Sequence, residues 1–208
     1  MKSHRNLMIG FVLLLAGVLG LVTMDGMMDR DGMKRMMKNM MGARLPPGIN
    51  PADLPEPGSA GARLLAQYCT QCHEMPGPGM HSASEWPPVA ARMNQRMQMM
   101  SGRVMMGMRP DIQVPTRREL AALIAYLQKH AQKTIDKNQY QDLNTSAGKS
   151  FAAVCSRCHA LPDPKQFTAD EWPVVVQRMI KNMKIMAKPV PDGETVETIL
   201  GFLQKHAR

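Results

Sequence analysis

The chain has 208 residues and a formal net charge of +9 at pH 7, and aromatic residues make up only 4% of it. This length allows one or two domains, although so few aromatic side chains are a poor supply for two hydrophobic cores. Lysine and arginine are scattered rather than gathered with aromatic residues, so the charge does not indicate a nucleic-acid-binding surface. The positive charge is explained by solvated helix faces, or by docking to an acidic partner or to anionic lipid.

The N-terminal segment carries Lys2 and Arg5, followed by an apolar run from Leu7 to Met24. Basic residues in front of an apolar run favour a cytoplasmic N-terminus. The run has about 18 residues, the lower limit for a membrane-spanning helix, and no Ala-x-Ala-like cleavage site follows it. We therefore predict that residues 1–24 are a membrane anchor, an uncleaved signal, with cleaved export as the alternative. Both place the rest of the chain on the periplasmic side of a bacterial inner membrane.

Residues 25–58 combine a methionine-rich segment with a proline-rich linker. Eight methionines lie within residues 24–41, and residues 45–58 are rich in proline. Thioethers are soft ligands, so one hypothesis is a Cu(I) site in residues 24–41. Because no histidine or cysteine joins the methionines, an amphipathic extension of the anchor is favoured. The linker is expected to be extended and to hold the following domains away from the membrane.

All four cysteines lie in two motifs of the form Cys-x-x-Cys-His, at residues 69–73 and 155–159. This spacing is typical of c-type haem, whose vinyl groups form thioethers with the cysteines while the histidine binds iron. A zinc site or a redox dithiol would leave both histidines unexplained. We therefore predict two covalently bound haem c groups. The attachment residues are Cys69, Cys72, Cys155 and Cys158, and the proximal iron ligands are His73 and His159.

The motifs belong to a longer internal repeat. Glu85-Trp86-Pro87 recurs 86 residues later as Glu171-Trp172-Pro173, and Leu127–Ala131 recurs 76 residues later as Leu203–Ala207. Self-similarity in a fixed order marks two copies of one structural unit, the first with about ten extra residues near 99–115. We predict haem domains over residues 59–134 and 135–208.

Each unit is predicted to hold three helices and no strand. The first helices are expected over residues 60–68 and 147–154, and the third over 116–131 and 193–207. For the second helices two N-caps compete. Ser82 and Thr168 would form capping boxes with Glu85 and Glu171, whereas Ser84 and Asp170 keep the following prolines within the first turn. The second choice is preferred.

A stripe of methionines on one face of each second helix supplies candidates for the sixth iron ligand. Methionine is the usual partner of histidine in electron-transfer haems, although flexible methionines also pack well against a porphyrin. His130 and His206 are rival ligands, but a cation at a helix C-terminus explains them better. The first-choice ligands are Met97 and Met183, and the alternatives are Met100, Met186, Met93 and Met179.

Each unit resembles a compact class I cytochrome c domain. The residues that carry the resemblance are Cys158-His159-Ala160-Leu161-Pro162-Asp163-Pro164, Glu171-Trp172-Pro173 and Arg178-Met179, which look like a short bacterial branch of that family. The resemblance covers the chain from about Ser59 onwards. It implies an all-α fold in which the first and last helices of each unit cross. Many class I domains hold the methionine in a longer loop, which the second unit lacks.

The combined interpretation is an all-α, membrane-anchored periplasmic protein with two tandem haem domains that passes single electrons between respiratory redox partners and is not itself an enzyme. One alternative is a cytochrome c subunit of a larger oxidase or dehydrogenase complex. Another is a di-haem peroxidase, which the short units and the lack of a distal acid/base constellation argue against.

Overall fold

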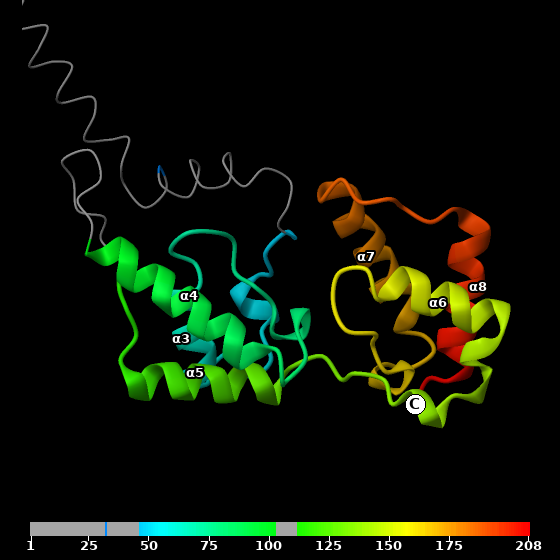
Figure 1. The fold of residues 1–208 in the computed structure, drawn as a ribbon, viewed down its shortest axis with the longest axis horizontal. Helices are drawn as coiled ribbons and strands as arrows, with labels where there is room; N and C mark the ends of the chain where they lie inside the picture. The colour runs from blue at the N-terminus through cyan, green and yellow to red at the C-terminus, as the bar shows by residue number, and fades with distance from the viewer. Residues whose placement is uncertain (1–31, 33–45, 103–111) are drawn as a thin grey trace, which may run out of the picture.

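The computed structural model describes Gly32, residues 46–102 and residues 112–208. Within these residues the chain forms six α-helices joined by loops and 3-10 turns, with isolated β-bridges but no strand (Figure 1). This confirms the all-α expectation. None of the described helices has the length and apolar character needed to cross a membrane. The predicted anchor at residues 1–24 and the methionine-rich stretch at 24–41 lie outside the described residues, apart from Gly32.

Three helices form a first group: α3 (Ala60–Tyr68), α4 (Trp86–Ser101) and α5 (Arg117–Lys129). Their inner faces enclose a hydrophobic cluster that includes Leu65, Trp86, Leu123 and Leu127. Helices α3 and α5 pack closely because position 61 is glycine. A Cβ atom there would lie 2.3 Å from the Cβ of Tyr126.

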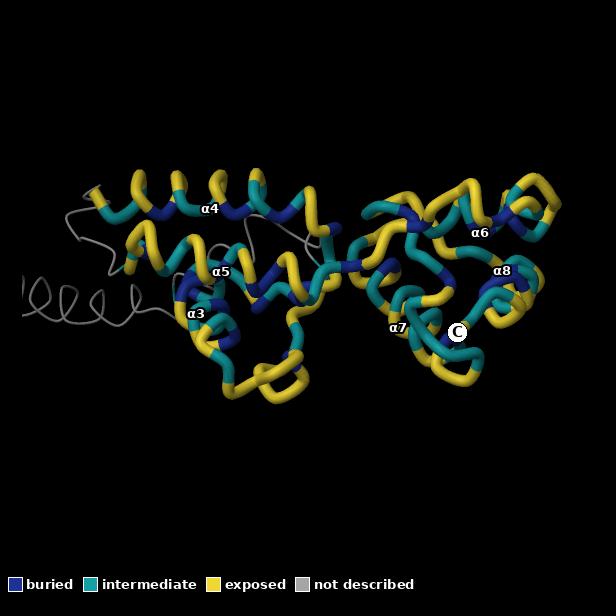
Figure 2. Tube along the Cα trace, turned by 90° about the horizontal axis from the view of Figure 1, so that it is seen from below, coloured by how far each residue is buried: buried dark blue, intermediate teal, exposed yellow. Residues whose placement is uncertain are grey.

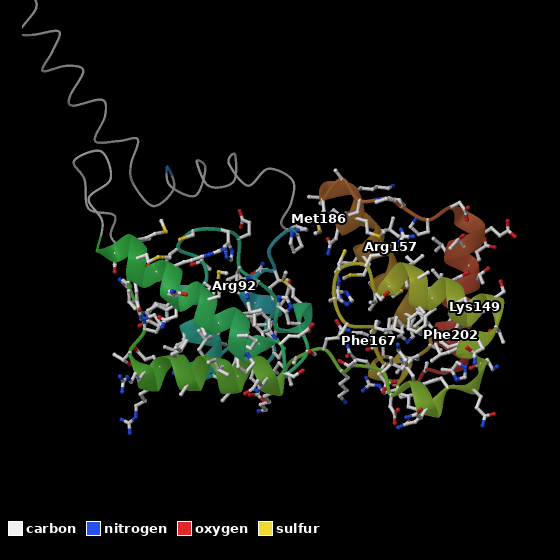
Figure 3. All side chains as sticks on the ribbon, in the orientation of Figure 1. Arg92, Lys149, Arg157, Phe167, Met186 and Phe202 are labelled. Atoms are coloured by element: carbon white, nitrogen blue, oxygen red, sulfur yellow. The ribbon has the colours of Figure 1, made fainter. Side chains whose placement is uncertain are left out.

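The second group contains α6 (Ser146–Cys155), α7 (Trp172–Ile185) and α8 (Gly193–Lys205). Phe151 of α6 and Phe202 of α8 stack with ring centroids 5.0 Å apart, inside a separate hydrophobic cluster. Figure 3 labels Phe202 and Phe167 in the lower part of this group. The first and last helices therefore pack together in both groups, as the resemblance to class I cytochromes c implies.

The ends of the helices test the predicted caps. Thr116 and Glu119 form the expected capping box at the start of α5, and Asp192 caps α8. The preference for Ser84 and Asp170 was wrong, because α4 and α7 begin at Trp86 and Trp172 with no side-chain cap. Instead, carboxylate oxygens of Glu85 and Glu171 accept the backbone N–H groups of Ser82 and Thr168, both at 2.8 Å. The prolines do lie in the first turn, as expected.

The two groups lie side by side and are joined by the chain that follows α5 (Figure 1). In Figure 2 the buried residues follow the inward faces of the helices in each group. Isolated bridges pair Ser82 with Gln132 and Thr134 with Pro162. Short 3-10 turns complete the described chain: η2 (Pro51–Asp53), η3 (Pro78–Met80), η4 (Lys137–Gln139), η5 (Gln141–Asn144) and η6 (Pro164–Gln166).

Candidate functional site

Each Cys-x-x-Cys-His motif follows the first helix of its group. Cys69 ends α3, with its N–H donating to the Leu65 carbonyl at 2.9 Å, and Cys155 is the last residue of α6. All four cysteines are free thiols. Burial raises the pKa of the Cys69 and Cys155 thiols to about 12, so both are protonated at neutral pH. Each first helix thus presents two unpaired thiols near its C-terminus.

The motif histidines have a defined tautomer. The Nδ1 atom of His73 lies 2.6 Å from the Glu74 carbonyl, and Nδ1 of His159 lies 2.8 Å from the Ala160 carbonyl. A carbonyl oxygen can only accept a hydrogen bond, so Nδ1 carries the proton and Nε2 keeps the lone pair that a metal needs. The structure places the acceptor on the residue directly after each histidine.

The methionine stripes occupy the inward faces of α4 and α7. Met97 and Met183 are buried, each with 8% of its surface exposed. The four alternative methionines are only partly buried, and Figure 3 shows Met186 near the end of α7, in the same part of the group as Arg157. Within the stripes, the most buried methionines thus occupy equivalent positions in the two groups. Their role as iron ligands stays a prediction.

A residue between the two cysteines connects the first motif to the chain beyond α4. The buried Gln71 amide donates to the Gln113 carbonyl at 2.8 Å and accepts the Gln113 N–H at 2.7 Å. The same amide nitrogen lies 3.6 Å from the Met97 sulfur. The first motif and the preferred methionine are therefore brought together by one side chain.

The second group repeats this connection with a different side chain. Arg157 stands where the first motif has Gln71, and its guanidinium donates to the Pro189 carbonyl at 3.1 Å. Gln113 and Pro189 each lie three residues before the N-cap of the last helix. Sequence reasoning missed this contact, although the 76-residue offset aligns the two acceptors.

The two tryptophans are held by the loops that follow the motifs. The indole N–H of Trp86 donates to the Pro78 carbonyl at 2.7 Å, and that of Trp172 donates to the Pro164 carbonyl at 2.9 Å. Both indole N–H groups are therefore bonded to the protein, which gives the tryptophans a structural role in fixing the loop.

The donor groups fit covalently attached haem. Each group offers two free thiols, an imidazole with an available Nε2 and a buried thioether, which is the set that a histidine–methionine c-type haem uses. In addition, the Oδ1 atom of Asn94 on α4 is buried without a hydrogen-bond partner among the described residues. An unpaired buried amide oxygen needs a donor, which a haem propionate does not supply, so this atom adds nothing to the case for haem.

Comparison with known proteins agrees with this chemistry. A model of the family described as cytochrome C oxidase, cbb3-type, subunit III matches residues 56–127, which include the first motif and Met97. The match supports a c-type cytochrome, a class with covalently bound haem c that transfers electrons. Neither the curated proteins nor the solved structures include a significant match to the chain.

Proposed function

We propose that this protein is a membrane-anchored di-haem cytochrome c that carries single electrons between respiratory redox partners on the periplasmic side of the inner membrane. One observation carries the proposal. The same donor set occurs twice in equivalent places: two thiols after a helix, a histidine with Nδ1 bonded to a carbonyl, and a buried methionine. A chance motif would not bring the other donors with it.

Each set of donors would hold one haem c. When bound, the haem supplies an iron that alternates between Fe(III) and Fe(II). The chain's own residues attach the group, orient the imidazole through its Nδ1–H bond and shield the site from water with a hydrophobic cluster. A thioether ligand raises the reduction potential. The first set is Cys69, Cys72, His73 and Met97, and the second is Cys155, Cys158, His159 and Met183.

The first test is the haem content and absorption spectrum of the detergent-purified full-length protein. We expect two haems per chain, the weak far-red band of methionine bound to Fe(III), and no reaction of the reduced protein with CO. A variant with Cys155→Ala and Cys158→Ala serves as the internal control, because it should retain one haem. Fewer than two haems in the unmodified protein would contradict the proposal, and CO binding would indicate an open iron suited to catalysis.

The location has its own test. Membranes from cells that produce the full chain are washed with alkaline carbonate, which releases peripheral proteins and retains those with a spanning anchor. We expect the haem protein to stay in the membrane fraction. Its release with the periplasmic contents would support cleaved export instead.

A second candidate function is that of a cytochrome subunit within a larger oxidase. The family match over residues 56–127 favours it, because that family is named for an oxidase subunit. Purification in mild detergent separates the two candidates. Stoichiometric co-purification with large oxidase subunits would support the subunit role, and a haem protein that elutes alone would support the independent carrier.

A further inference from the structure

Gln132 lies in the segment that joins the two groups of helices, yet only 5% of its surface is exposed. Its backbone N–H donates to the His81 carbonyl of the first group at 3.0 Å. A buried, polar side chain on a linker is unusual, because linkers normally run over the surface. The contacts of its amide therefore need an explanation.

The side chain of Gln132 reaches the residue directly after the second motif. Its Nε2 atom donates to the Ala160 carbonyl, which is also the acceptor for Nδ1–H of His159 at 2.8 Å. One carbonyl oxygen thus accepts two donors, one from the predicted iron ligand and one from the linker. Two donors that share an acceptor compete for its electron density, so each of the two bonds is weaker than it would be alone.

Among the described residues of the first group, the Glu74 carbonyl, which is the counterpart of the Ala160 carbonyl, is bonded to the His73 side chain and to no other side chain. Arg208 follows α8 as Gln132 follows α5, and its N–H donates to the Phe167 carbonyl at 3.3 Å, the counterpart of the bond to His81. Its guanidinium, however, lies 3.6 Å from the Glu171 carboxylate. The backbone contact is common to both groups, whereas the bond from the Gln132 side chain to the Ala160 carbonyl has no counterpart at Arg208, whose guanidinium pairs with Glu171.

Neighbouring bonds hold Gln132 in register. The N–H of Asp163 donates to the Lys133 carbonyl at 2.9 Å, and the N–H of Ile135 donates to the Leu161 carbonyl at 3.0 Å. The linker and the loop after the second motif therefore run beside each other directly after the Gln132 contact. This fixes the amide relative to the Ala160 carbonyl at little further entropic cost.

We propose that Gln132 is a positioning residue for the second haem, which raises the reduction potential of that haem by sharing the Ala160 carbonyl with His159. This proposal rests on the proposed function. A weaker Nδ1–H bond makes the imidazole a poorer electron donor to iron, which disfavours Fe(III) relative to Fe(II). Because Gln132 is also bonded to the loop that carries His81, the tuning of the second site depends on contact with the first group.

The test uses the full-length di-haem protein with Gln132→Met, which keeps the length of the side chain but removes the donor. We expect the His159 Nδ1–H proton resonance of the reduced protein to move downfield as its bond strengthens, and the midpoint potential of the second haem to fall. The His73 resonance and the first haem should not change. Single-haem variants that lack one pair of cysteines assign the signals to the two sites.

Gln128→Met is the matched control, since the Gln128 amide donates to the Ala83 carbonyl at 3.0 Å, which lies outside both motifs. Gln132→Glu is a second test variant, because its carboxylate cannot donate to Ala160 and adds a negative charge, so the potential should fall further. Unchanged His159 signals and potentials in both Gln132 variants, or equal shifts at both haems, would overturn the inference. Fewer than two haems in the unmodified protein would instead overturn the proposed function.

Discussion

His81 and Phe167 occupy equivalent positions, and each ring packs edge-on against a tryptophan. The centroid of His81 lies 4.8 Å from that of Trp86, and the centroid of Phe167 lies 5.0 Å from that of Trp172. Because the counterpart of His81 is phenylalanine, this position does not offer an iron ligand that both units share. The structure gives His81 an aromatic packing role in the same place.

This packing has a consequence for stability in acid. Burial lowers the pKa of His81 below its usual 6.5, and the neighbouring Glu85 carboxylate only partly opposes the shift. The unfolded chain therefore binds more protons, so stability falls as the pH drops below about 6.5 and stops falling below the folded pKa. We expect His81→Phe to remove this part of the acid sensitivity, measured as the free energy of unfolding across that range.

The reciprocal substitution in the second group is the control for His81→Phe. Phe167→His should introduce the same acid sensitivity into the second group, because it buries an ionisable ring against Trp172. If the unfolding free energy of His81→Phe falls as steeply on acidification as that of the unmodified protein, the acid sensitivity comes from other groups.

The choice among the methionines is the second prediction at this scale. Replacing Met97 or Met183 by leucine should remove about half of the far-red band of the oxidised protein, because each is expected to bind one of two irons. Absorption spectroscopy measures the loss. Met100→Leu and Met186→Leu are the controls and should keep the full band, since both side chains are only partly buried. Loss of half the band from a control variant would move the ligand to that position.

At the residue scale, spacing alone assigns the four cysteines and two histidines to haem, because the covalent chemistry fixes their order along the chain, and this assignment stays a prediction. The acceptors for Nδ1 of His73 and His159 were not predictable in the same way. Which carbonyl meets the ring depends on the path of the following loop, and that path is set by contacts such as Trp86 with Pro78. The burial that distinguishes Met97 from Met100 likewise depends on how α4 packs.

The six helices followed from sequence because their apolar spacing and caps agree. The capping box at Thr116 and the cap at Asp192 are strong local signals with no competitor. At α4 and α7 two signals competed. The carboxylate half of the capping box formed, while the prolines moved the first helical residue to the following tryptophan. Local rules gave the elements but could not rank two overlapping starts.

The crossing of α3 and α5 depends on Gly61. A methyl group there would lie 2.3 Å from the Cβ of Tyr126, far inside van der Waals contact. Gly61→Ala gains about 1 kcal/mol of helix propensity but forces the helices apart, which costs typically about 1–3 kcal/mol. The clash should win, and denaturant unfolding should show a lower midpoint.

A second helical glycine provides the matched control for Gly61. Gly201 lies on the exposed face of α8, where an added Cβ meets nothing within 4 Å. Gly201→Ala should therefore stabilise the protein by roughly 0.5–1 kcal/mol. An increase in stability for Gly61→Ala as well would mean that α3 and α5 can separate without loss of packing.

At the scale of the whole molecule, the internal repeat predicted two similar units, and the structure shows two groups of helices with separate hydrophobic clusters. The repeat could not predict how the groups meet. Their junction relies on Gln132 and Lys133, which bond to the loop after the second motif. In the repeat, Gln132 aligns with Arg208 and not with a second glutamine. Contacts that occur once in a molecule leave no periodic signal in its sequence.

Separate clusters lead to a prediction about cooperativity. Each cluster draws its buried residues from one half of the described chain, and hydrogen bonds of the linker connect the two groups. We therefore expect the double variant Cys69→Ala, Cys72→Ala to lose the first haem while the second group stays folded. Heating should then produce two transitions, an early one in the far-ultraviolet circular dichroism signal and a later one shared with the haem absorption band.

The complementary variant, Cys155→Ala with Cys158→Ala, is the control and should reverse the order in which the two groups unfold. A single transition in both variants would show that the junction couples the two groups into one cooperative unit. The hydrogen bonds of the linker would then hold the groups together as strongly as each hydrophobic cluster holds its own helices.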